Sequence, residues 1–224
     1  NILLTGAFGN VGASALQALL AQGHRVRCFD LPSKANRRTA RRLRHWSQGT
    51  PGQMQVLWGD LRRPENVRAA VRDQDVVVHL AFIIPKLSAT GVESEAQPAW
   101  ARAINVGGTE NVIRALHAQP RPGSLLFASS YHIYGCTPDR RLPLTLADSL
   151  QPMEHYARHK VTCEKLIRTS GLRWAIFRLA ATLPLAMRLD SGMFDVPLDN
   201  RMEFVHTHDV GLAVANGVGN AHLW

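Results

Sequence analysis

Two side chains whose types and spacing suit proton transfer lie in the segment Tyr156-Ala157-Arg158-His159-Lys160. In a helix, positions i and i+4 share a face, so the phenol of Tyr156 and the ammonium of Lys160 point the same way. A free tyrosine has a pKa of about 10 and is a poor base at neutral pH, whereas a nearby cation favours the phenolate and lowers that pKa. The spacing therefore predicts a general acid/base pair, although it also occurs by chance in many helices.

A hydroxyl group lies where such a pair needs a partner. Residues 125–129 predict a strand, and Ser130 follows directly at its carboxyl end. Ligands of parallel α/β sheets bind at the carboxyl ends of the strands. Ser130 is therefore a candidate to donate a hydrogen bond to the substrate oxygen that Tyr156 protonates or deprotonates.

The elements that must position these groups alternate regularly along the chain. We expect strands at residues 2–5, 24–30, 54–58, 75–81, 125–129 and 172–179, and helices at 11–22, 35–46, 64–72, 98–118, 153–170 and 208–218. The run Val76-Val77-Val78 is typical of a strand buried on both faces. This alternation predicts an α/β fold, a Rossmann-type doubly wound parallel sheet with helices on both faces.

A glycine-rich turn ends the first expected strand, with Gly6, Gly9 and Gly12 each three positions apart. Gly6 permits the tight turn, Gly9 lets the backbone approach a pyrophosphate, and Gly12 lets the next helix pack against the sheet. That helix then offers free N–H groups and its positive end to phosphates. We therefore expect residues 1–180 to be a dinucleotide-binding domain that includes the Tyr156 helix. Residues 181–224 would be a partial substrate lobe, loop-like at 184–201, with a returning helix.

The choice of dinucleotide depends on Asp30, at the end of the second expected strand. It lies 18 residues after Gly12, close to the spacing of about 20 for an acid that binds the adenosine ribose. A carboxylate there accepts from both ribose hydroxyls and repels a 2′-phosphate, which favours NAD over NADP. Lys34, Arg37 and Arg38 leave NADP open, because they could bind a 2′-phosphate unless they form a solvated helix face.

Composition bounds the remaining classes of function. Hydrophobic residues make up 46% of the 224 positions and charged residues 19%, an ordinary globular balance without an apolar run long enough to span a membrane. We expect no signal peptide, because the first residues have no basic lead and no cleavage site, and the missing initial Met indicates a trimmed N-terminus. Three cysteines without a CxxC pair favour a reducing, cytoplasmic location with no disulfide framework and no metal site.

The net charge of +9 comes mainly from one segment. Residues 25–44 hold eight basic residues and one acid, which gives +7 and leaves +2 for the rest of the chain. A nucleic-acid binder using residues 37–44 is a weak alternative, because only Trp46 is an aromatic residue near the patch and the remaining surface is nearly neutral. We expect a small-molecule substrate and no nucleic-acid or membrane partner.

Taken in order, these motifs resemble the extended branch of the short-chain dehydrogenase/reductase superfamily, the NAD-dependent epimerase/dehydratase family. The resemblance runs from residue 2 to about 217. It rests on the glycine turn, Asp30, Gly59-Asp60-Leu61, His79-Leu80-Ala81, Asn105-Val106-Gly107-Gly108-Thr109, Ser129-Ser130 with Tyr134-Gly135, Tyr156 with Lys160, Arg178, and Phe204-Val205-His206 with Asp209-Val210.

The resemblance implies roles for individual residues. Ser130, Tyr156 and Lys160 would be the catalytic triad, with hydride transfer at the nicotinamide C4 coupled to proton transfer through Tyr156. His206 and Asp209 would form a structural pair. The cofactor-binding set would be Gly6, Phe8, Gly9, Asn10, Val11, Gly12, Asp30, Asp60 and Leu61 at the adenine, Leu80, Ala81 and Phe82 along the cleft, Asn105 in support, and Tyr156 and Lys160.

The chain also departs from members that use nucleotide sugars. The run from Arg178 to Pro184 holds no Asn, although such members usually carry one shortly after this Arg, and Met202 stands where they tend to have Arg. The run Phe82-Ile83-Ile84-Pro85 is apolar, which suits a less polar substrate, as in NADPH-dependent carbonyl reductases of the dihydroflavonol-reductase or hydroxysteroid-dehydrogenase type. The short distance from Arg178 to Phe204 indicates a truncated or compact substrate lobe.

Two further expectations concern partners. A non-catalytic dinucleotide sensor is the other alternative, but such proteins typically lose the Tyr or the Lys, and both are present here. In the family, the helix at residues 98–118 and the helix carrying Tyr156 commonly pair across a two-fold axis. A homodimer is therefore a further prediction.

Overall fold

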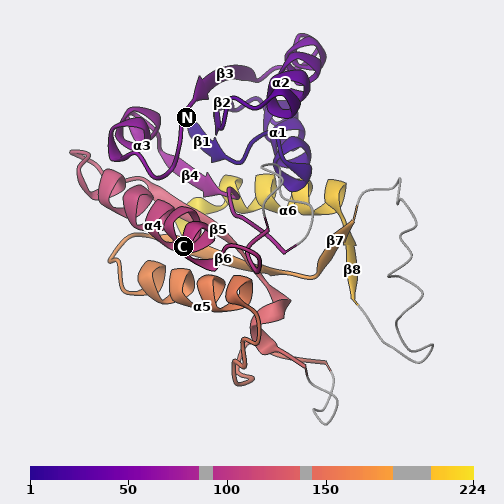
Figure 1. The fold of residues 1–224 in the computed structure, drawn as a ribbon. Helices are drawn as coiled ribbons and strands as arrows, with labels where there is room; N and C mark the ends of the chain where they lie inside the picture. The colour runs from indigo at the N-terminus through magenta and orange to yellow at the C-terminus, as the bar shows by residue number, and fades with distance from the viewer. Residues whose placement is uncertain (86–92, 137–142, 184–202) are drawn as a thin grey trace.

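The structure, a computed structural model, describes residues 1–85, 93–136, 143–183 and 203–224. Its centre is a six-stranded sheet in the order β3-β2-β1-β4-β5-β6, in which every neighbouring pair is parallel (Figure 1). The strands are β1 (Ile2–Thr5), β2 (Arg25–Asp30), β3 (Gln53–Trp58), β4 (Val76–His79), β5 (Ser124–Ser130) and β6 (Trp174–Leu179). All residues of β1, β4 and β5 are buried, as continuous apolar strands predict.

Helices cover both faces of this sheet (Figure 1). One apolar core lies under α1 (Asn10–Ala21), α2 (Lys34–Ser47) and α6 (Thr207–Gly219). The other lies under α3 (Pro64–Val71), α4 (Pro98–His117) and α5 (His155–Arg168). The arrangement is the Rossmann-type doubly wound α/β fold that the sequence predicts, and it places the carboxyl ends of β1, β4 and β5 along one edge.

Several short elements have no counterpart in the sequence prediction. They are the 3-10 helices η1 (Tyr131–Tyr134) and η3 (Ala221–Leu223) and a second sheet of β7 (Ala181–Leu183) and β8 (Phe204–His206). Strands of three residues are too short to show a period in the sequence. The loop predicted at residues 184–201 lies outside the described residues, and the division at residue 180 stays a prediction.

Three further features of the described residues concern membrane spans, metal ligands and cysteines. None of their helices is both long and apolar enough to cross a bilayer. In the same ranges no three His, Cys, Asp or Glu side chains lie together as potential metal ligands. Cys28 and Cys163 are buried thiols and Cys136 is an exposed one.

Candidate active site

Strand β5 and helix α5 bring Ser130, Tyr156 and Lys160 together. The Ser130 hydroxyl accepts from the N–H of His132 at 3.3 Å, so its own proton is free to bond the Tyr156 phenol. Lys160 Nζ lies 5.5 Å from the centroid of the Tyr156 ring. Ser130 precedes Tyr156 by 26 positions and Lys160 by 30, and the fold brings all three side chains to one site at the end of β5.

The ammonium of Lys160 is enclosed by other groups. The residue is 4% exposed, and its Nζ donates to the carbonyl oxygen of Ala128 at 2.5 Å. The same Nζ lies 3.5 Å from the centroid of the Phe82 ring, which also meets the Tyr156 ring edge-on at 5.7 Å. Phe82, predicted to line the cleft, therefore covers the Tyr–Lys pair.

Burial shifts both groups toward their neutral forms. It raises the pKa of Tyr156 to about 12, a change that the hydrogen bond from Ser130 opposes only in part. It also lowers the pKa of Lys160 to about 7. The prediction that Lys160 lowers the Tyr156 pKa is thus wrong for this structure, because burial of the phenol raises that pKa instead.

The N-terminus of α5 is held by a residue that the sequence analysis missed. Glu95 accepts hydrogen bonds from the backbone N–H of His155 and of Tyr156, each at 3.0 Å. The preceding residue Glu154 makes no side-chain cap, so the cap comes from 61 positions away. Burial alone would raise the pKa of Glu95, but these N–H bonds outweigh it and lower that pKa. Glu95 thus fixes the first turn of the helix that carries Tyr156.

Asn105 holds the segment after β4 from within α4. Its side-chain oxygen accepts from the N–H of Ile83 at 2.7 Å, and its side-chain nitrogen donates to the Ile83 carbonyl at 3.0 Å. The residue is fully buried, and the same nitrogen lies 3.4 Å from His159 Nδ1. Asn105 thus ties the backbone next to Phe82 to α4 and α5, and its part in supporting a cofactor stays a prediction.

His79 connects the ends of β1 and β4 to α4. Its ring nitrogens lie 2.7 Å from Thr5 Oγ1 and 3.1 Å from Thr109 Oγ1. Thr109 Oγ1 in turn donates to the carbonyl of Asn105 at 2.6 Å, and Thr5 Oγ1 accepts from the N–H of Ala81 at 3.2 Å. Burial lowers the pKa of His79 to about 3, so this imidazole is neutral. The motif was visible in the sequence, but its bonds were not.

The glycine turn has the tight geometry that its spacing predicts. Gly6 has φ of 67°, and a Cβ there would lie 2.7 Å from the backbone nitrogen of Ala81. A Cβ on Gly12 would lie 2.0 Å from the Gly6 carbonyl oxygen. A Cβ on Gly9 would meet only that oxygen, at 3.5 Å, which is ordinary contact. The fold itself therefore requires Gly6 and Gly12 but leaves open space at Gly9, as a ligand-facing glycine needs.

Helix α1 follows this turn with an open N-terminus. It begins at Asn10, has no side-chain cap from Gly9 and carries no acid in its first turn, which also holds Val11 and Gly12. An uncapped helix start leaves backbone N–H groups and a partial positive charge for an anion. These residues fit a diphosphate.

Asp30 lies beside the turn at the end of β2. Its Oδ2 accepts from the N–H of Phe8 at 3.0 Å, and its Oδ1 accepts from the N–H of Leu31 at 2.8 Å and the amide of Asn36 at 3.0 Å. Burial raises the pKa of this carboxyl, and the bonds from Phe8 and Leu31 oppose the rise. Oδ2 keeps acceptor capacity for a ribose hydroxyl.

The residues expected at the adenine and along the cleft make different contacts within the fold. The Asp60 carboxylate is paired with Arg62 at 2.6 Å, and Leu61 is buried against Gly108. Leu80 packs at the edge of the α1 core and Ala81 at the edge of the α4 core. Their contacts with a cofactor stay predictions.

A buried ion pair anchors the strand next to Ser130. Arg178 on β6 donates to both carboxylate oxygens of Glu164 on α5, at 3.0 and 2.8 Å, and to the hydroxyl of Tyr134 at 2.7 Å. Burial alone would raise the Glu164 pKa, but the Arg178 bonds outweigh it and lower that pKa. Arg178 appeared among the sequence motifs, whereas its partner Glu164 did not.

The pairing expected of His206 and Asp209 is not what the structure shows. His206 accepts from the N–H of His208 at 3.3 Å and so caps the start of α6. Asp209 instead lies 3.6 Å from the His208 ring, and both of those side chains are exposed. Local capping satisfies His206 without a partner one turn away.

The parallel sheet, the glycine turn and the Tyr–Lys helix at its carboxyl edge define a Rossmann-type domain of the extended short-chain dehydrogenase/reductase superfamily. Residues 2–183 match the family described as the NAD dependent epimerase/dehydratase family. The chain belongs to this family.

Individual relatives are longer proteins. Over 122 residues the chain is 37% identical to a 3 beta-hydroxysteroid dehydrogenase/Delta 5-->4-isomerase of Mycobacterium tuberculosis, covering 54% of the chain and 29% of that protein. Over 193 residues it is 30% identical to the short-chain dehydrogenase/reductase family 42E member 1 of Mus musculus, covering 82% of the chain and 45% of that protein. The chain thus spans less than half the length of these two curated relatives.

Solved structures share the fold. A UDP-glucose-4-epimerase from Stenotrophomonas maltophila, with bound NAD and formylated UDP-arabinopyranose, superposes with a TM-score of 0.78 at 22% identity, over 98% of the chain and 74% of that protein. A short-chain dehydrogenase/reductase superfamily protein from Agrobacterium tumefaciens with bound NAD superposes with a TM-score of 0.62 at 27% identity. The match covers 82% of the chain and 50% of that protein.

Proposed function

We propose that this chain is the dinucleotide-binding and catalytic part of an NAD-dependent oxidoreductase that acts on a hydroxyl or carbonyl carbon of a small molecule. The observation that carries the proposal is the grouping of Ser130, Tyr156 and Lys160 at the sheet edge where the glycine turn opens α1. Family membership and the dehydrogenases among its curated relatives support the same chemistry.

NAD fits the nucleotide end of this site better than NADP. The α1 N-terminus would hold the diphosphate, and Asp30 would accept from the ribose hydroxyls and repel a 2′-phosphate. Arg37, one candidate for a 2′-phosphate, is instead bonded to the Pro32 carbonyl at 3.1 Å, with its guanidinium 5.3 Å from the Trp58 ring centroid. When bound, the nicotinamide supplies the hydride acceptor or donor.

Tyr156 would exchange the proton with the substrate oxygen, and Ser130 would donate a hydrogen bond to that oxygen. With its pKa raised to about 12, the phenol is protonated at neutral pH, the form that donates a proton to a carbonyl oxygen. Taking a proton from an alcohol requires a cation nearer to the phenol oxygen. Lys160 is the cation that this chain offers, once its ammonium leaves the Ala128 carbonyl.

A less polar alcohol, of the hydroxysteroid type, is the substrate class that the chain supports best. The segment after β4 is apolar, with Phe82 over the Tyr–Lys pair and Ile84 exposed at the surface. The hydroxysteroid dehydrogenases among the curated relatives point the same way. A nucleotide sugar is the second candidate, since structural neighbours carry such ligands, but these neighbours share only the fold.

The first test is a parallel fluorescence titration with NADH and NADPH. We expect tight binding of NADH and weak binding of NADPH; stronger binding of NADPH would make a reductase the better assignment, and binding of neither would overturn the proposal. The second test is NAD reduction with a panel that holds a 3β-hydroxysteroid, a simple secondary alcohol and UDP-glucose.

Variants separate catalysis from binding. Tyr156→Phe and Ser130→Ala should keep NADH binding and lose turnover by about 100-fold or more, the usual contribution of a general acid/base. Ser129→Ala changes the neighbouring hydroxyl of the same strand and should keep turnover. If Tyr156→Phe leaves turnover unchanged, the proposed mechanism is wrong. If the unmodified chain binds NADH but converts none of the substrates, the non-catalytic dinucleotide sensor becomes the better interpretation.

The homodimer and the cytoplasmic location stay predictions. Light scattering on the purified chain would give the mass, 24.8 kDa for one copy. A single-copy mass at every concentration would rule out pairing through α4 and α5.

A further inference from the structure

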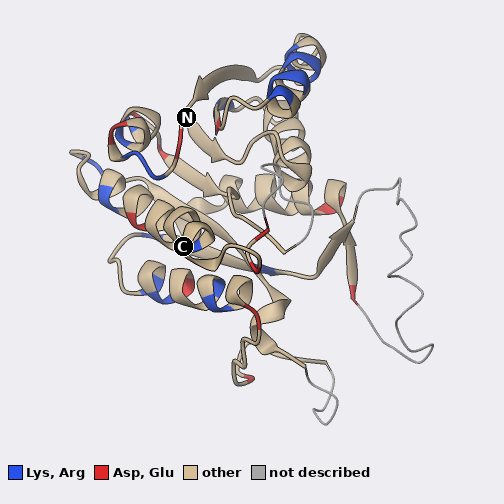
Figure 2. Cartoon of the chain, in the orientation of Figure 1, with Lys and Arg blue, Asp and Glu red and all other residues tan. Residues whose placement is uncertain are grey.

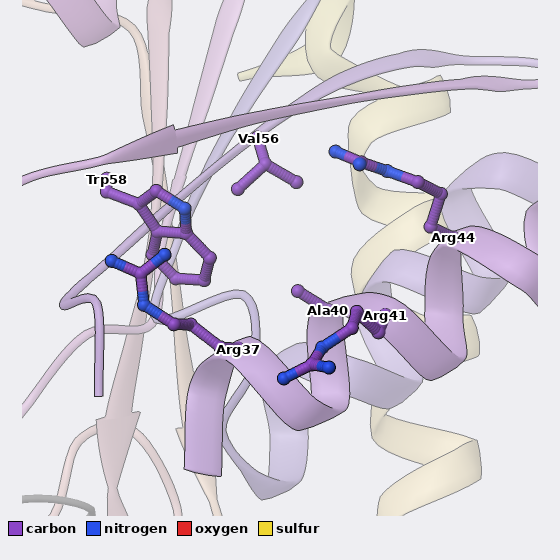
Figure 3. Close-up of a pocket in the computed structure, with 6 residues that line it drawn as sticks. All are labelled: Arg37, Ala40, Arg41, Arg44, Val56 and Trp58. Carbon is purple, nitrogen blue, oxygen red and sulfur yellow. The ribbon is translucent and has the colours of Figure 1, made fainter. Parts of the chain in front are cut away.

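A second concave site lies away from the Tyr–Lys pair, between α2 and the edge strand β3. It has a volume of about 270 Å³ and is lined by Arg37, Ala40, Arg41, Arg44, Val56 and Trp58 (Figure 3). The arginines come from one side of α2, and Val56 and Trp58 project from β3 on the opposite side (Figure 3). The site is therefore a cationic pocket with an apolar wall.

Two of its guanidinium groups have no partner among the residues that the structure describes. Within the described ranges, Arg41 and Arg44 form no ion pair and no side-chain hydrogen bond, and both are exposed. The indole N–H of Trp58 donates to no described group either, and its nitrogen lies on the ring edge turned toward the pocket (Figure 3). Arg37 is already fixed over the Trp58 ring, 5.3 Å from its centroid. The pocket thus offers several unused donors and no acceptor side chain.

Among the described elements packed around α2, no free carboxylate balances this charge. Helix α2 carries six Lys and Arg residues and no acid, and Figure 2 shows several blue bands and no red along it. The elements packed against α2, which are α1 and β3, contain no acid, and β2 contains only Asp30. The oxygens of Asp30 already accept three internal hydrogen bonds. An anion from outside is the group that this surface lacks.

The basic helix is also electrostatically unfavourable on its own. Arg37 and Arg41 are i,i+4 neighbours, Arg41 and Arg44 are i,i+3 neighbours, and like charges at these spacings repel. Lys34 stands in the first turn, where the helix dipole disfavours a cation. A bound anion between Arg41 and Arg44 would offset this repulsion.

We propose that this pocket is a binding site for a small phosphate-bearing anion, separate from the dinucleotide site. Guanidinium groups bind phosphate oxygens in pairs, and the indole N–H adds a further donor. The volume is below that of typical drug-sized ligand sites, which favours a small anion such as a diphosphate group over a whole dinucleotide. Arg41 and Arg44 lie seven and ten residues beyond the start of α2, about 10–15 Å along the helix from the end nearest Asp30.

The direct test is calorimetric titration of the full chain with inorganic pyrophosphate at constant ionic strength. We expect saturable binding at one site, unchanged when NADH is present at saturation. The double variant Arg41→Ala/Arg44→Ala should weaken it roughly tenfold or more, the loss expected for charge-assisted hydrogen bonds. The matched variant Arg38→Ala/Arg42→Ala removes the same charge from the same helix outside the pocket, and should change it less than about twofold.

Three results would overturn the proposal. Pyrophosphate that gives no more heat than salt of equal ionic strength would show that no site exists. Equal losses in the two double variants would show diffuse attraction to the whole helix, as a nucleic-acid surface would give. Loss of pyrophosphate binding with NADPH but not with NADH would assign the pocket to a 2′-phosphate and remove its independence. Circular dichroism confirms that each variant is folded, and alanine favours helix at all four positions.

Discussion

Replacing Lys160 by methionine is expected to stabilise the folded chain while removing the ammonium that the proposed chemistry uses. Lys160 is 4% exposed, and burial lowers its pKa from the ordinary 10.5 to about 7. The charged form is thus less favourable in the fold than in the unfolded chain. Methionine has a similar length and no charge to desolvate.

The sign and size of the effect follow from the difference between the two pKa values. A base with a lowered folded pKa destabilises the fold fully below that pKa, and the penalty fades as pH rises toward the unfolded value. A fall from 10.5 to about 7 corresponds to a penalty on the order of 5 kcal/mol at the acid end. The variant loses the bond to the Ala128 carbonyl and the contact with Phe82, so we expect a net gain of about 1–3 kcal/mol near neutral pH.

Urea unfolding between about pH 6 and 10 measures this gain, provided the transition is two-state. The free energy of unfolding of Lys160→Met minus that of the unmodified chain should be largest at the acid end and shrink toward pH 10. Lys165→Met, at an exposed position of the same helix, is the control and should stay within about 0.5 kcal/mol. A Lys160→Met chain that is no more stable than the original near neutral pH, or a difference independent of pH, would refute the reasoning.

Three further predictions test the remaining parts of the site. Gly12→Ala should prevent or severely weaken folding because its Cβ would lie 2.0 Å from a carbonyl oxygen, whereas Gly9→Ala should fold normally and bind NADH at least about tenfold more weakly; similar thermal stability of the two would contradict this. Glu95→Ala should lower kcat several-fold with little change in KM for NAD, and Glu95→Gln should recover part of it through one amide oxygen; an unchanged kcat would reduce Glu95 to a surface contact. Glu164→Ala should lower the free energy of unfolding by about 3–5 kcal/mol in urea, because it leaves the buried Arg178 guanidinium without its partner. Glu110→Ala, which breaks an exposed pair, is the control and should cost about 0–1 kcal/mol. Because the Glu164 pKa is lowered in the fold, the stabilisation is present above the unfolded pKa and disappears as acid protonates the carboxylate.

Much of the fold was predictable because its signals are local. The β-branched run at residues 76–78, the glycine spacing from Gly6 to Gly12, and Pro64 and Pro98 at helix starts each fix one element within a few residues. The types and order of these elements leave few topologies, since parallel strands need right-handed crossovers. The six-stranded sheet follows from these local signals.

The grouping of Ser130, Tyr156 and Lys160 was predictable from the sequence, but the effect of burial on their pKa values was not. The spacing of Tyr156 and Lys160 shows two groups on one helix face, and says nothing of how deeply the sheet buries them. Burial reverses the expected direction of the Tyr156 pKa. The cap from Glu95 and the ion pair of Glu164 join positions far apart in the chain, which no local pattern reveals.

The hydroxyl bonds around His79 decide which of its nitrogens carries the proton. Thr109 Oγ1 donates its proton to the Asn105 carbonyl, so it can only accept a hydrogen bond from His79. The imidazole must therefore carry its proton on Nε2. Nδ1 then accepts from the hydroxyl of Thr5. Every proton in this chain of bonds points one way, and each has an acceptor already. His79 therefore joins the first strand to the long helix through hydrogen bonds of fixed direction.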